Sequence, residues 1–182
     1  FVLPAAIDKV IMVAIAPNGT DQVNMVAIDK QETHQQGLDD PFSKTGKGWP
    51  DYIIGVIVEL EQAGYEIEGF DCVFGGNIPI GAGLSSSAAL EGGFITGLAE
   101  IFDLKIPLKD RALLAQKAEN EFVGVQCGIM DQFVNIHGKD EHALMLDCRS
   151  LDYELYPFTQ DDVHIVLCDT KVRRELASSE YN

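Results

Sequence analysis

Apolar and polar residues alternate near the start of the chain in the way that is typical of β-strands. Residues 1–16 and 21–29 are rich in β-branched and other apolar side chains, and the polar stretch between them contains the pair Asn18-Gly19. Because this pair favours a tight turn between strands, the pattern predicts a β-hairpin. Residues 31–48 are polar and contain several glycines, which predicts a loop.

The next segment has the spacing of an amphipathic helix. Between residues 49 and 64, apolar side chains recur at intervals of three and four, at Tyr52, Ile53, Val56, Ile57 and Leu60. A proline near the first turn and a glycine past the last one fit the ends of a helix. Residues 69–77 alternate between apolar and other side chains and predict a strand.

The rest of the chain mixes helical and strand patterns. Residues 87–102 predict a helix that contains Gly92, Gly93 and Gly97. Each glycine costs a helix roughly 1 kcal/mol relative to alanine, but it permits the close approach of another backbone. Further helices are predicted at 108–123 and 128–138, and further strands at 142–148 and 162–170. This order predicts a mixed α+β or α/β domain.

Composition and charge narrow the possible partners. The 182 residues are 46% hydrophobic and 23% charged, which suits one globular domain. The formal net charge of −16 argues against a nucleic-acid surface, which needs clustered Lys and Arg. An anionic ligand would therefore depend on backbone amides, a helix N-terminus or a metal ion. No run of 18 apolar residues occurs, so no membrane partner is expected.

The cysteines and histidines carry no recognisable chemistry. The four cysteines form no C-x-x-C pair and have no histidine at zinc-finger spacing. Buried free thiols in a reducing, cytoplasmic setting are the expectation. The four histidines match no catalytic pattern and are interpreted as structural or solvent-facing; they are His34, His137, His142 and His164.

The stretch "NIPIGAGLSSSAALEGG", residues 77–93, lies where a strand is predicted to run into a helix. It is not a Walker A loop, and Ser86 stands where a G-x-G-x-x-G motif would have its third glycine. Gly81 and Gly83 let the backbone approach a ligand, and the three serines begin a helix whose free amides favour an anion. The residues alone leave two interpretations open: a phosphate cradle, or a serine cap beside a flexible glycine turn.

Longer motifs connect this loop with the rest of the chain. "GLSSSAALE" (83–91) is followed by "AENEFVGVQCGIMDQF" (118–133), "LDCRSLDYELYPF" (146–158) and "KVRRELASSEYN" (171–182). Together they resemble the GHMP small-molecule kinases, and "CGIMDQF" with "SSEYN" is specific to the galactokinase branch of that family. The resemblance implies an α+β fold with a β-α-β architecture similar to ribosomal-protein domains. It also implies that residues 1–182 form most of the N-terminal domain, without the family's first signature and without the C-terminal domain. Such a fragment is expected to be inactive alone.

The same resemblance implies a role for particular residues. Asp131 corresponds to the catalytic base, and Glu119 and Ser87 correspond to the ligands of Mg²⁺. The loop around the triphosphate of ATP would consist of Gly81, Ala82, Gly83, Leu84, Ser85, Ser86 and Ser87. Trp49 either flanks the adenine or is ordinary buried packing. Gly128, Asp131 and Tyr181 correspond to positions that contact the sugar.

The function implied is the ATP- and Mg²⁺-dependent phosphorylation of the C1 hydroxyl of galactose, which gives α-D-galactose 1-phosphate. Two alternatives stay open: a kinase for a related sugar such as N-acetylgalactosamine, and a non-catalytic sensor of sugar and ATP. The complete serine loop and the presence of Asp131 favour an enzyme over a sensor. The kinase interpretation requires that the loop and Asp131 face one another across a gap the size of a sugar.

Overall fold

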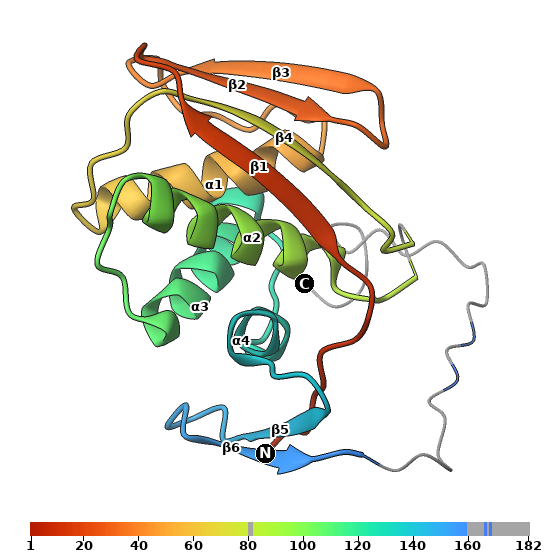
Figure 1. Cartoon of the computed structure of the whole chain (residues 1–182). Coiled ribbons are helices and arrows are strands. Elements are labelled where there is room, and N and C mark those ends of the chain that lie inside the picture. Colours follow the sequence, from red (N-terminus) through yellow and green to blue (C-terminus); the bar gives the residue numbers. More distant parts are fainter. Residues whose placement is uncertain (80–81, 160–165, 167, 169–182) are drawn as a thin grey trace.

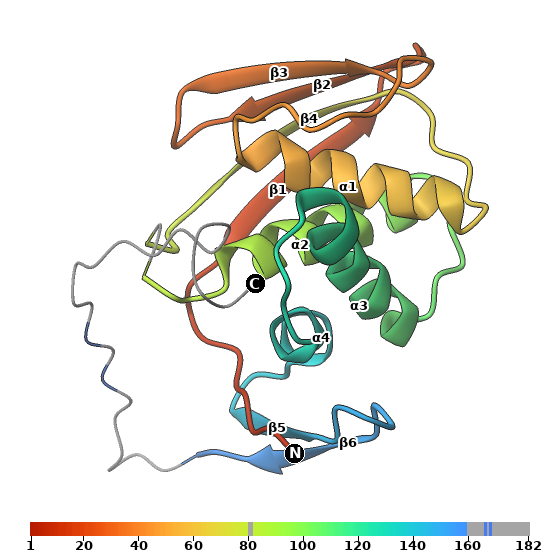
Figure 2. The same cartoon turned by 180° about the vertical axis from the view of Figure 1, so that it is seen from behind.

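The computed structural model describes residues 1–79, 82–159, 166 and 168. A four-stranded sheet lies on one side of a layer of helices, and a two-stranded sheet lies on the other side (Figures 1 and 2). Sheets and helices occupy separate layers, so the predicted α+β class is confirmed.

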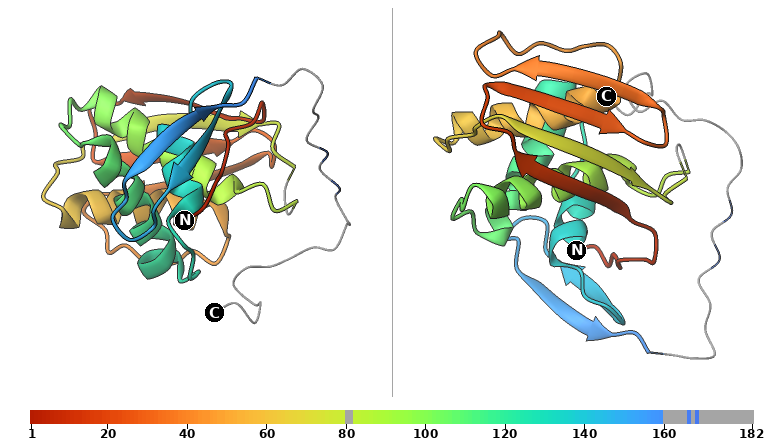
Figure 3. Two further views of the ribbon diagram at one scale, coloured as in Figure 1. Left: turned by 90° about the horizontal axis from the view of Figure 1, so that it is seen from below. Right: turned by 45° about the horizontal axis from the view of Figure 1, so that its top comes forward.

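The larger sheet consists of β1 (Ile11–Pro17), β2 (Gln22–Ala27), β3 (Glu32–Gly37) and β4 (Phe70–Gly76). Their order is β1-β4-β2-β3, as the right-hand view of Figure 3 shows. β4 is antiparallel to β1 and parallel to β2, and β2 is antiparallel to β3. Alternate residues of β2 and β4 point into the core, which is why the spacing of two is so clear in both strands.

The hairpin predicted at Asn18-Gly19 is wrong. β4 lies between β1 and β2, so the two strands that this turn joins are not paired. The turn holds the start of β4 instead: Asn18 N–H donates to the Gly69 carbonyl (3.0 Å), and Gly69 N–H donates to the Thr20 carbonyl (3.0 Å). The side-chain amide of Asn18 also donates to Asp71 Oδ1 of β4 at 2.9 Å.

The loop predicted for residues 31–48 is wrong over its first part, because residues 32–37 form β3. β3 is an edge strand with β2 as its partner. Most of its side chains are exposed or only partly buried, so it has no apolar alternation to reveal it.

The helices are α1 (Trp49–Gln62), α2 (Ser86–Ile101), α3 (Leu108–Lys117) and α4 (Met130–His137). All four predicted helices are confirmed. The last six residues of the segment predicted at 108–123 form a π-helix instead of an α-helix, η1 (Ala118–Val123). The main core lies between the sheet and the helices, and its largest fully buried members include Ile53, Phe70 and Phe94.

The glycines of α2 permit close packing against side chains of neighbouring elements. A Cβ placed on Gly97 would lie 2.8 Å from Ile15 Cδ1 of β1, and one on Gly93 would lie 3.2 Å from Val13 Cγ2. A Cβ on Gly92 would overlap the side-chain oxygen of Asn135 in α4. The close neighbours are thus side chains of β1 and α4. The prediction that another backbone approaches these glycines is wrong.

The second sheet pairs β5 (His142–Leu146) with β6 (Tyr153–Pro157) and covers α4, as the left-hand view of Figure 3 shows. β5 confirms the predicted strand, whereas β6 was not predicted. The chain before β1 is a lead-in whose Val2 and Ala5 form bridges to β5. The strand predicted at 162–170 lies outside the described residues.

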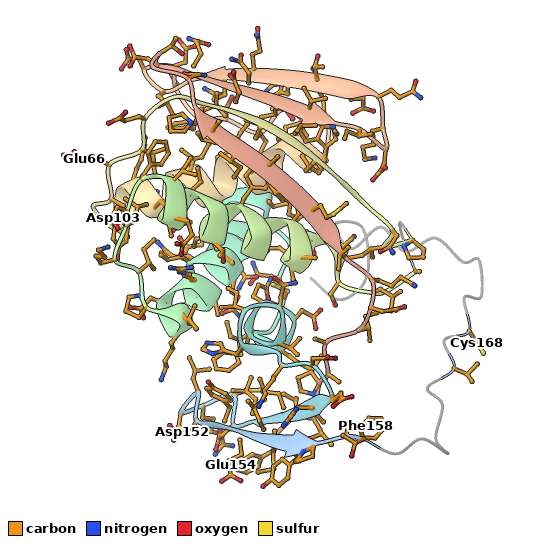
Figure 4. All side chains as sticks on the ribbon, viewed as in Figure 1. Glu66, Asp103, Asp152, Glu154, Phe158 and Cys168 are labelled. Atoms are coloured by element: carbon orange, nitrogen blue, oxygen red, sulfur yellow. The ribbon has the colours of Figure 1, made fainter. Side chains whose placement is uncertain are left out.

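The surface carries much of the acidic charge. In Figure 4, Glu66, Asp103, Asp152 and Glu154 all lie at the periphery of the molecule. Cys72 is buried, but Cys148 and Cys168 are exposed, so the expectation of buried thiols is wrong for these two. Within the described part of the chain, no helix is long and apolar enough to cross a membrane.

Candidate active site

The serine loop leads into α2 through an unusual backbone conformation. Ser85 precedes the first helical residue and has φ 53°, in the left-handed region that residues other than glycine rarely adopt. Its hydroxyl caps no helix amide. It donates instead to Asp131 Oδ2 at 2.7 Å. The interpretation of this serine as a simple helix cap is therefore wrong.

The start of α2 offers backbone amides to a ligand. The first hydrogen bond of the helix at this end runs from Ala89 N–H to the Ser85 carbonyl, at 3.0 Å. The amides before it have no acceptor within the helix, and the helix dipole adds partial positive charge there. Gly83 has φ 72°, a conformation that suits glycine. Ala82 and Leu84 are described beside it and are partly buried, whereas Gly81 lies outside the described residues.

Asp131 lies in the first turn of α4 and is half-buried. Its contact with Ser85 brings the carboxylate to the start of α2, although 46 positions separate the two residues. The loop and the carboxylate thus meet on the same side of the molecule, but Ser85 contacts Asp131 directly, so the predicted gap the size of a sugar does not separate these two side chains.

Glu119 lies in η1 and is only 2% exposed. Its Oε2 accepts a hydrogen bond from Gln132 Nε2 at 2.7 Å. Burial raises the pKa of the Glu119 carboxyl, and the charge of Asp131 adds to this effect, while interactions with Ser87, Cys127 and Glu91 oppose it. Ser87 and Glu119 are therefore neighbours, as the resemblance implied.

Glu119 lies in the first turn of the π-helix η1. The carbonyl of Glu119 accepts from both Gly124 N–H (2.9 Å) and Val125 N–H (3.0 Å), which are five and six residues later. Single π-helical turns inside helices are frequent at functional sites. Gly124, with φ 82°, then ends the helix and allows the chain to turn toward α4.

The donor set fits a magnesium ion. Carboxylate and hydroxyl oxygens are ligands that Mg²⁺ accepts, and this ion usually keeps several further positions for water and phosphate. Because burial disfavours the ionised form of Glu119, a cation beside it would stabilise that form. Among the described residues, no group of three or more His, Cys, Asp or Glu is arranged to hold a metal ion.

A cavity of about 260 Å³ adjoins the start of α2. Trp49, Tyr52, Phe74 and Leu90 form much of its wall, and Ser86 and Ser87 line it on the helix side. Burial raises the pKa of Tyr52 to about 12, and the charges of Glu119 and Glu91 add to the shift. Tyr52, on the cavity wall, is therefore close to the carboxyl groups of Glu119 and Glu91.

Trp49 is packed in the core, as one of the two interpretations predicted, and it also borders the cavity. It is 6% exposed, its ring packs edge-on against Phe74 with centroids 5.3 Å apart, and its indole N–H donates to Glu32 Oε2 at 2.6 Å. A well-packed indole at the wall of a cavity presents a rigid apolar surface to a ligand.

Of the two residues predicted only for the sugar, one is described. Gly128 is exposed and lies three residues before Asp131, and a Cβ placed on it would meet nothing within 4 Å. Tyr181 lies outside the described residues.

Comparison with known proteins agrees with the fold. Residues 51–139 match the family model of the GHMP kinases N terminal domain. The chain is 44% identical over 181 residues to a galactokinase of Pyrococcus furiosus and 42% identical over 182 residues to one of Roseiflexus sp.. These matches cover 100% of the chain but only 50% and 46% of those proteins, respectively. The chain is a galactokinase homologue with a GHMP kinase N-terminal domain. It spans about half the length of the curated relatives that it matches.

A solved structure of the same branch has the same fold. The galactokinase of Lactococcus lactis, crystallised with galactose, superimposes with a TM-score of 0.82 at 37% identity. The superposition covers 85% of this chain and 41% of that one.

The structure of this galactokinase homologue adds site residues that the sequence analysis did not assign. Glu91 and Gln132 are fully buried beside Glu119, and Tyr52 lines the cavity. One signal could have revealed Glu91, since it is the only charged residue between Ser87 and Ala99 in an otherwise apolar helix. Buried polar residues in such a position usually need a partner.

Proposed function

We propose that the protein containing this chain transfers the γ-phosphoryl group of ATP to the C1 hydroxyl of galactose in a Mg²⁺-dependent reaction. The products are α-D-galactose 1-phosphate and ADP. The hydrogen bond from Ser85 Oγ to Asp131 Oδ2, at 2.7 Å, is the observation that carries this proposal. Phosphoryl transfer requires the phosphate donor and the acceptor hydroxyl to be adjacent and in line, so the phosphate loop and the base must be neighbours.

The cavity at the start of α2 is the proposed site of the nucleotide. The adenine would lie against Trp49, Tyr52 and Phe74, whose side chains provide an apolar wall. Ser86 and Ser87 line the same cavity, so the phosphates would point toward the free amides of α2. Residues 81–87 would then surround the triphosphate with backbone donors, in a chain whose 13 Lys and Arg residues are outnumbered by 29 Asp and Glu residues.

Glu119 and Ser87 would hold the magnesium ion. When bound, Mg²⁺ neutralises charge on the transferred phosphoryl group and on the departing diphosphate. Glu119 offers a carboxylate whose charge is poorly compensated by its buried surroundings. Ser87 adds an uncharged oxygen in the first turn of α2, on the wall of the nucleotide cavity.

Asp131 would act as the base. As the C1 oxygen of the sugar forms its bond to the γ-phosphorus, the proton of that hydroxyl passes to the Asp131 carboxylate. The bond between the γ-phosphorus and the bridging oxygen breaks, and ADP leaves with that oxygen. Ser85 would orient the carboxylate through the hydrogen bond already present, so that one oxygen stays directed at the sugar.

The sugar would lie between Asp131 and the open space at Gly128, with Tyr181 as a further contact. The galactose bound to the Lactococcus lactis relative favours this substrate over N-acetylgalactosamine. We further propose that the protein acts on galactose and ATP in the cytoplasm, where ATP is available.

The test is a coupled assay of ADP release with the complete product of the gene that encodes these residues. Galactose, N-acetylgalactosamine and glucose are compared at equal concentrations, with and without Mg²⁺. Mg²⁺-dependent ADP release with galactose, and phosphate on C1 of the product, would support the proposal. Release with N-acetylgalactosamine alone would indicate the related kinase, and saturable binding of galactose and ATP without release would indicate a sensor.

A further inference from the structure

Three polar side chains meet at a fully buried junction of three helices. Glu91 of α2 and Gln132 of α4 are 0% exposed, and Glu119 of η1 is 2% exposed. The Gln132 amide nitrogen donates to Glu119 Oε2 at 2.7 Å and lies 3.2 Å from Glu91 Oε2. An amide NH₂ group carries two hydrogens, so one group can serve both carboxyls.

This arrangement is a poor way to stabilise a fold. Glu91 Oε1 and Gln132 Oε1 are buried, and neither has a hydrogen-bond partner among the described residues. A buried polar atom without a partner costs about 1–3 kcal/mol. Apolar side chains of similar volume would fill the same space without that cost. The polar junction therefore calls for an explanation other than stability.

Oε2 of Glu119 is the acceptor for two neighbouring side chains, Gln132 and Cys127. Glu119 Oε2 accepts from Gln132 at 2.7 Å and from the Cys127 thiol at 3.5 Å. The Glu119 carboxyl also forms side-chain hydrogen bonds with Ser87 and Glu91. An amide at 2.7 Å restricts rotation of the carboxylate, whereas a free glutamate side chain would sample several rotamers.

We propose that Gln132 is a positioning residue that holds the Glu119 carboxylate in the orientation needed to bind the magnesium ion of the nucleotide. The inference rests on the proposed function, because it assigns Glu119 to that ion. Glu91 anchors the other side of the Gln132 amide, so that α2, η1 and α4 are connected through one side chain. Gln132 also follows Asp131 directly in α4, so its hydrogen bond connects Glu119 to the helix that carries the proposed base.

The test compares the affinity for ADP with and without Mg²⁺, measured by titration calorimetry on the complete gene product. Gln132→Met keeps the length of the side chain and removes both amide hydrogens. In the unmodified protein, Mg²⁺ should increase the affinity for ADP by a certain factor. We expect that factor to be about tenfold smaller in Gln132→Met, as is usual when the partner of a metal ligand is removed. Its affinity for ADP without metal should change less than twofold.

Gln116→Met is the matched control. Gln116 also bonds near the junction, to the Cys127 carbonyl at 3.0 Å, but it has no hydrogen bond to Glu119 in the described structure. It should keep the full effect of Mg²⁺. A Gln132→Met protein that unfolds cooperatively and also keeps the full effect of Mg²⁺ would overturn the proposal.

A second pair of variants covers the case in which Gln132→Met does not fold. Glu91→Gln keeps an acceptor for the Gln132 amide and should retain the effect of Mg²⁺, whereas Glu91→Met removes that acceptor and should reduce it. Equal effects of Mg²⁺ in these two variants would contradict the positioning role. If Mg²⁺ does not strengthen ADP binding even in the unmodified protein, the assignment of Glu119 in the proposed function is wrong as well.

Discussion

The hydroxyl of Ser85 donates to the carboxylate of Asp131 at 2.7 Å and so joins the start of α2 to the start of α4. The Ser85 hydroxyl makes this contact instead of capping its own helix. Ser85 also adopts a left-handed backbone conformation, which costs a residue with a Cβ roughly 1–2 kcal/mol. Strain of this kind persists where the surrounding structure imposes it, and it is concentrated at functional sites.

Asp131→Asn should abolish turnover and leave nucleotide binding intact. Asparagine keeps an oxygen that can accept from Ser85, so the loop should stay in place, but it accepts no proton from the sugar. We expect kcat to fall by at least about 100-fold, while the affinity for ADP with Mg²⁺ changes less than twofold. Coupled ADP release and calorimetry measure the two quantities. The exposed Asp152→Asn serves as control, and a collapse of nucleotide affinity in Asp131→Asn would mean that the residue is structural.

Ser85→Gly should lower kcat without lowering the stability of the fold. Glycine adopts positive φ without strain, so the free energy of unfolding should rise by about 1 kcal/mol or stay unchanged. The Asp131 carboxylate loses its orienting donor, and kcat should fall about tenfold, the effect of one hydrogen bond to a charged group. Urea denaturation and steady-state kinetics give the two values.

Asp103→Gly is the control for the backbone effect in Ser85→Gly. Asp103 has φ 52° and is exposed far from the site, where its ion pair with Lys105 contributes little to stability. Asp103→Gly should change the free energy of unfolding as Ser85→Gly does, but it should leave kcat unchanged. If Ser85→Gly had full activity, the hydrogen bond to Asp131 would have no part in catalysis.

The sequence predicted all four helices, most clearly α1, in which apolar residues recur at intervals of three and four. It predicted the strands less well, because strand pairing is a property of the whole fold. The turn signal at Asn18-Gly19 was real, but β4, which comes some 50 residues later, occupies the place between β1 and β2. The polar residues of β3 gave no alternation, since this edge strand exposes most of its side chains.

The motifs predicted that the serine loop, Glu119 and Asp131 belong to one site, and the described structure brings all three together. The motifs did not predict the buried junction of Glu91, Glu119 and Gln132. Gln132 lies next to Asp131 in the sequence, but only the packing of α2, η1 and α4 shows that its amide reaches Glu91 and Glu119. The π-helical turn that contains Glu119 also has no distinct local pattern, because its residues suit an α-helix equally well.

Gly128→Ala should weaken sugar binding without weakening the fold. Gly128 does not have positive φ, and a Cβ placed there would meet nothing within 4 Å. The melting temperature should therefore stay within about 2 °C, which corresponds to less than 1 kcal/mol. If the sugar occupies the open space, the added methyl group should raise KM for galactose roughly tenfold, a loss of about 1.4 kcal/mol. KM for ATP should not change.

Gly124→Ala gives the opposite pattern and serves as comparison for Gly128→Ala. Gly124 has φ 82°, and its Cβ would lie 2.8 Å from Lys44 Nζ, so this substitution should lower the free energy of unfolding by about 1 kcal/mol or more. An unchanged KM for galactose in Gly128→Ala would show that the sugar does not approach this position.

Glu91→Gln should change how stability depends on pH. Burial raises the pKa of the Glu91 carboxyl to about 10, and the charge of Glu119 adds to the shift. In the unfolded chain a glutamate has a pKa of about 4.3. Between these two values the folded protein keeps a proton that the unfolded chain releases, so the free energy of unfolding falls as pH rises. Glutamine has no such proton, and this contribution disappears.

The free energy of unfolding of Glu91→Gln, relative to that of the unmodified protein, should therefore increase from pH 5 to pH 8. The increase should be at most about 1.4 kcal/mol per pH unit. Urea denaturation at pH 5, 6, 7 and 8 measures it, with the exposed Glu66→Gln as a control that should show no such growth. Near pH 4 the two proteins should be similar, since Glu91 is then largely protonated in both states. A parallel pH dependence of Glu91→Gln and the unmodified protein would mean that Glu91 is ionised in the folded state. The junction with Glu119 would then hold two negative charges, and Gln132 would have to compensate both.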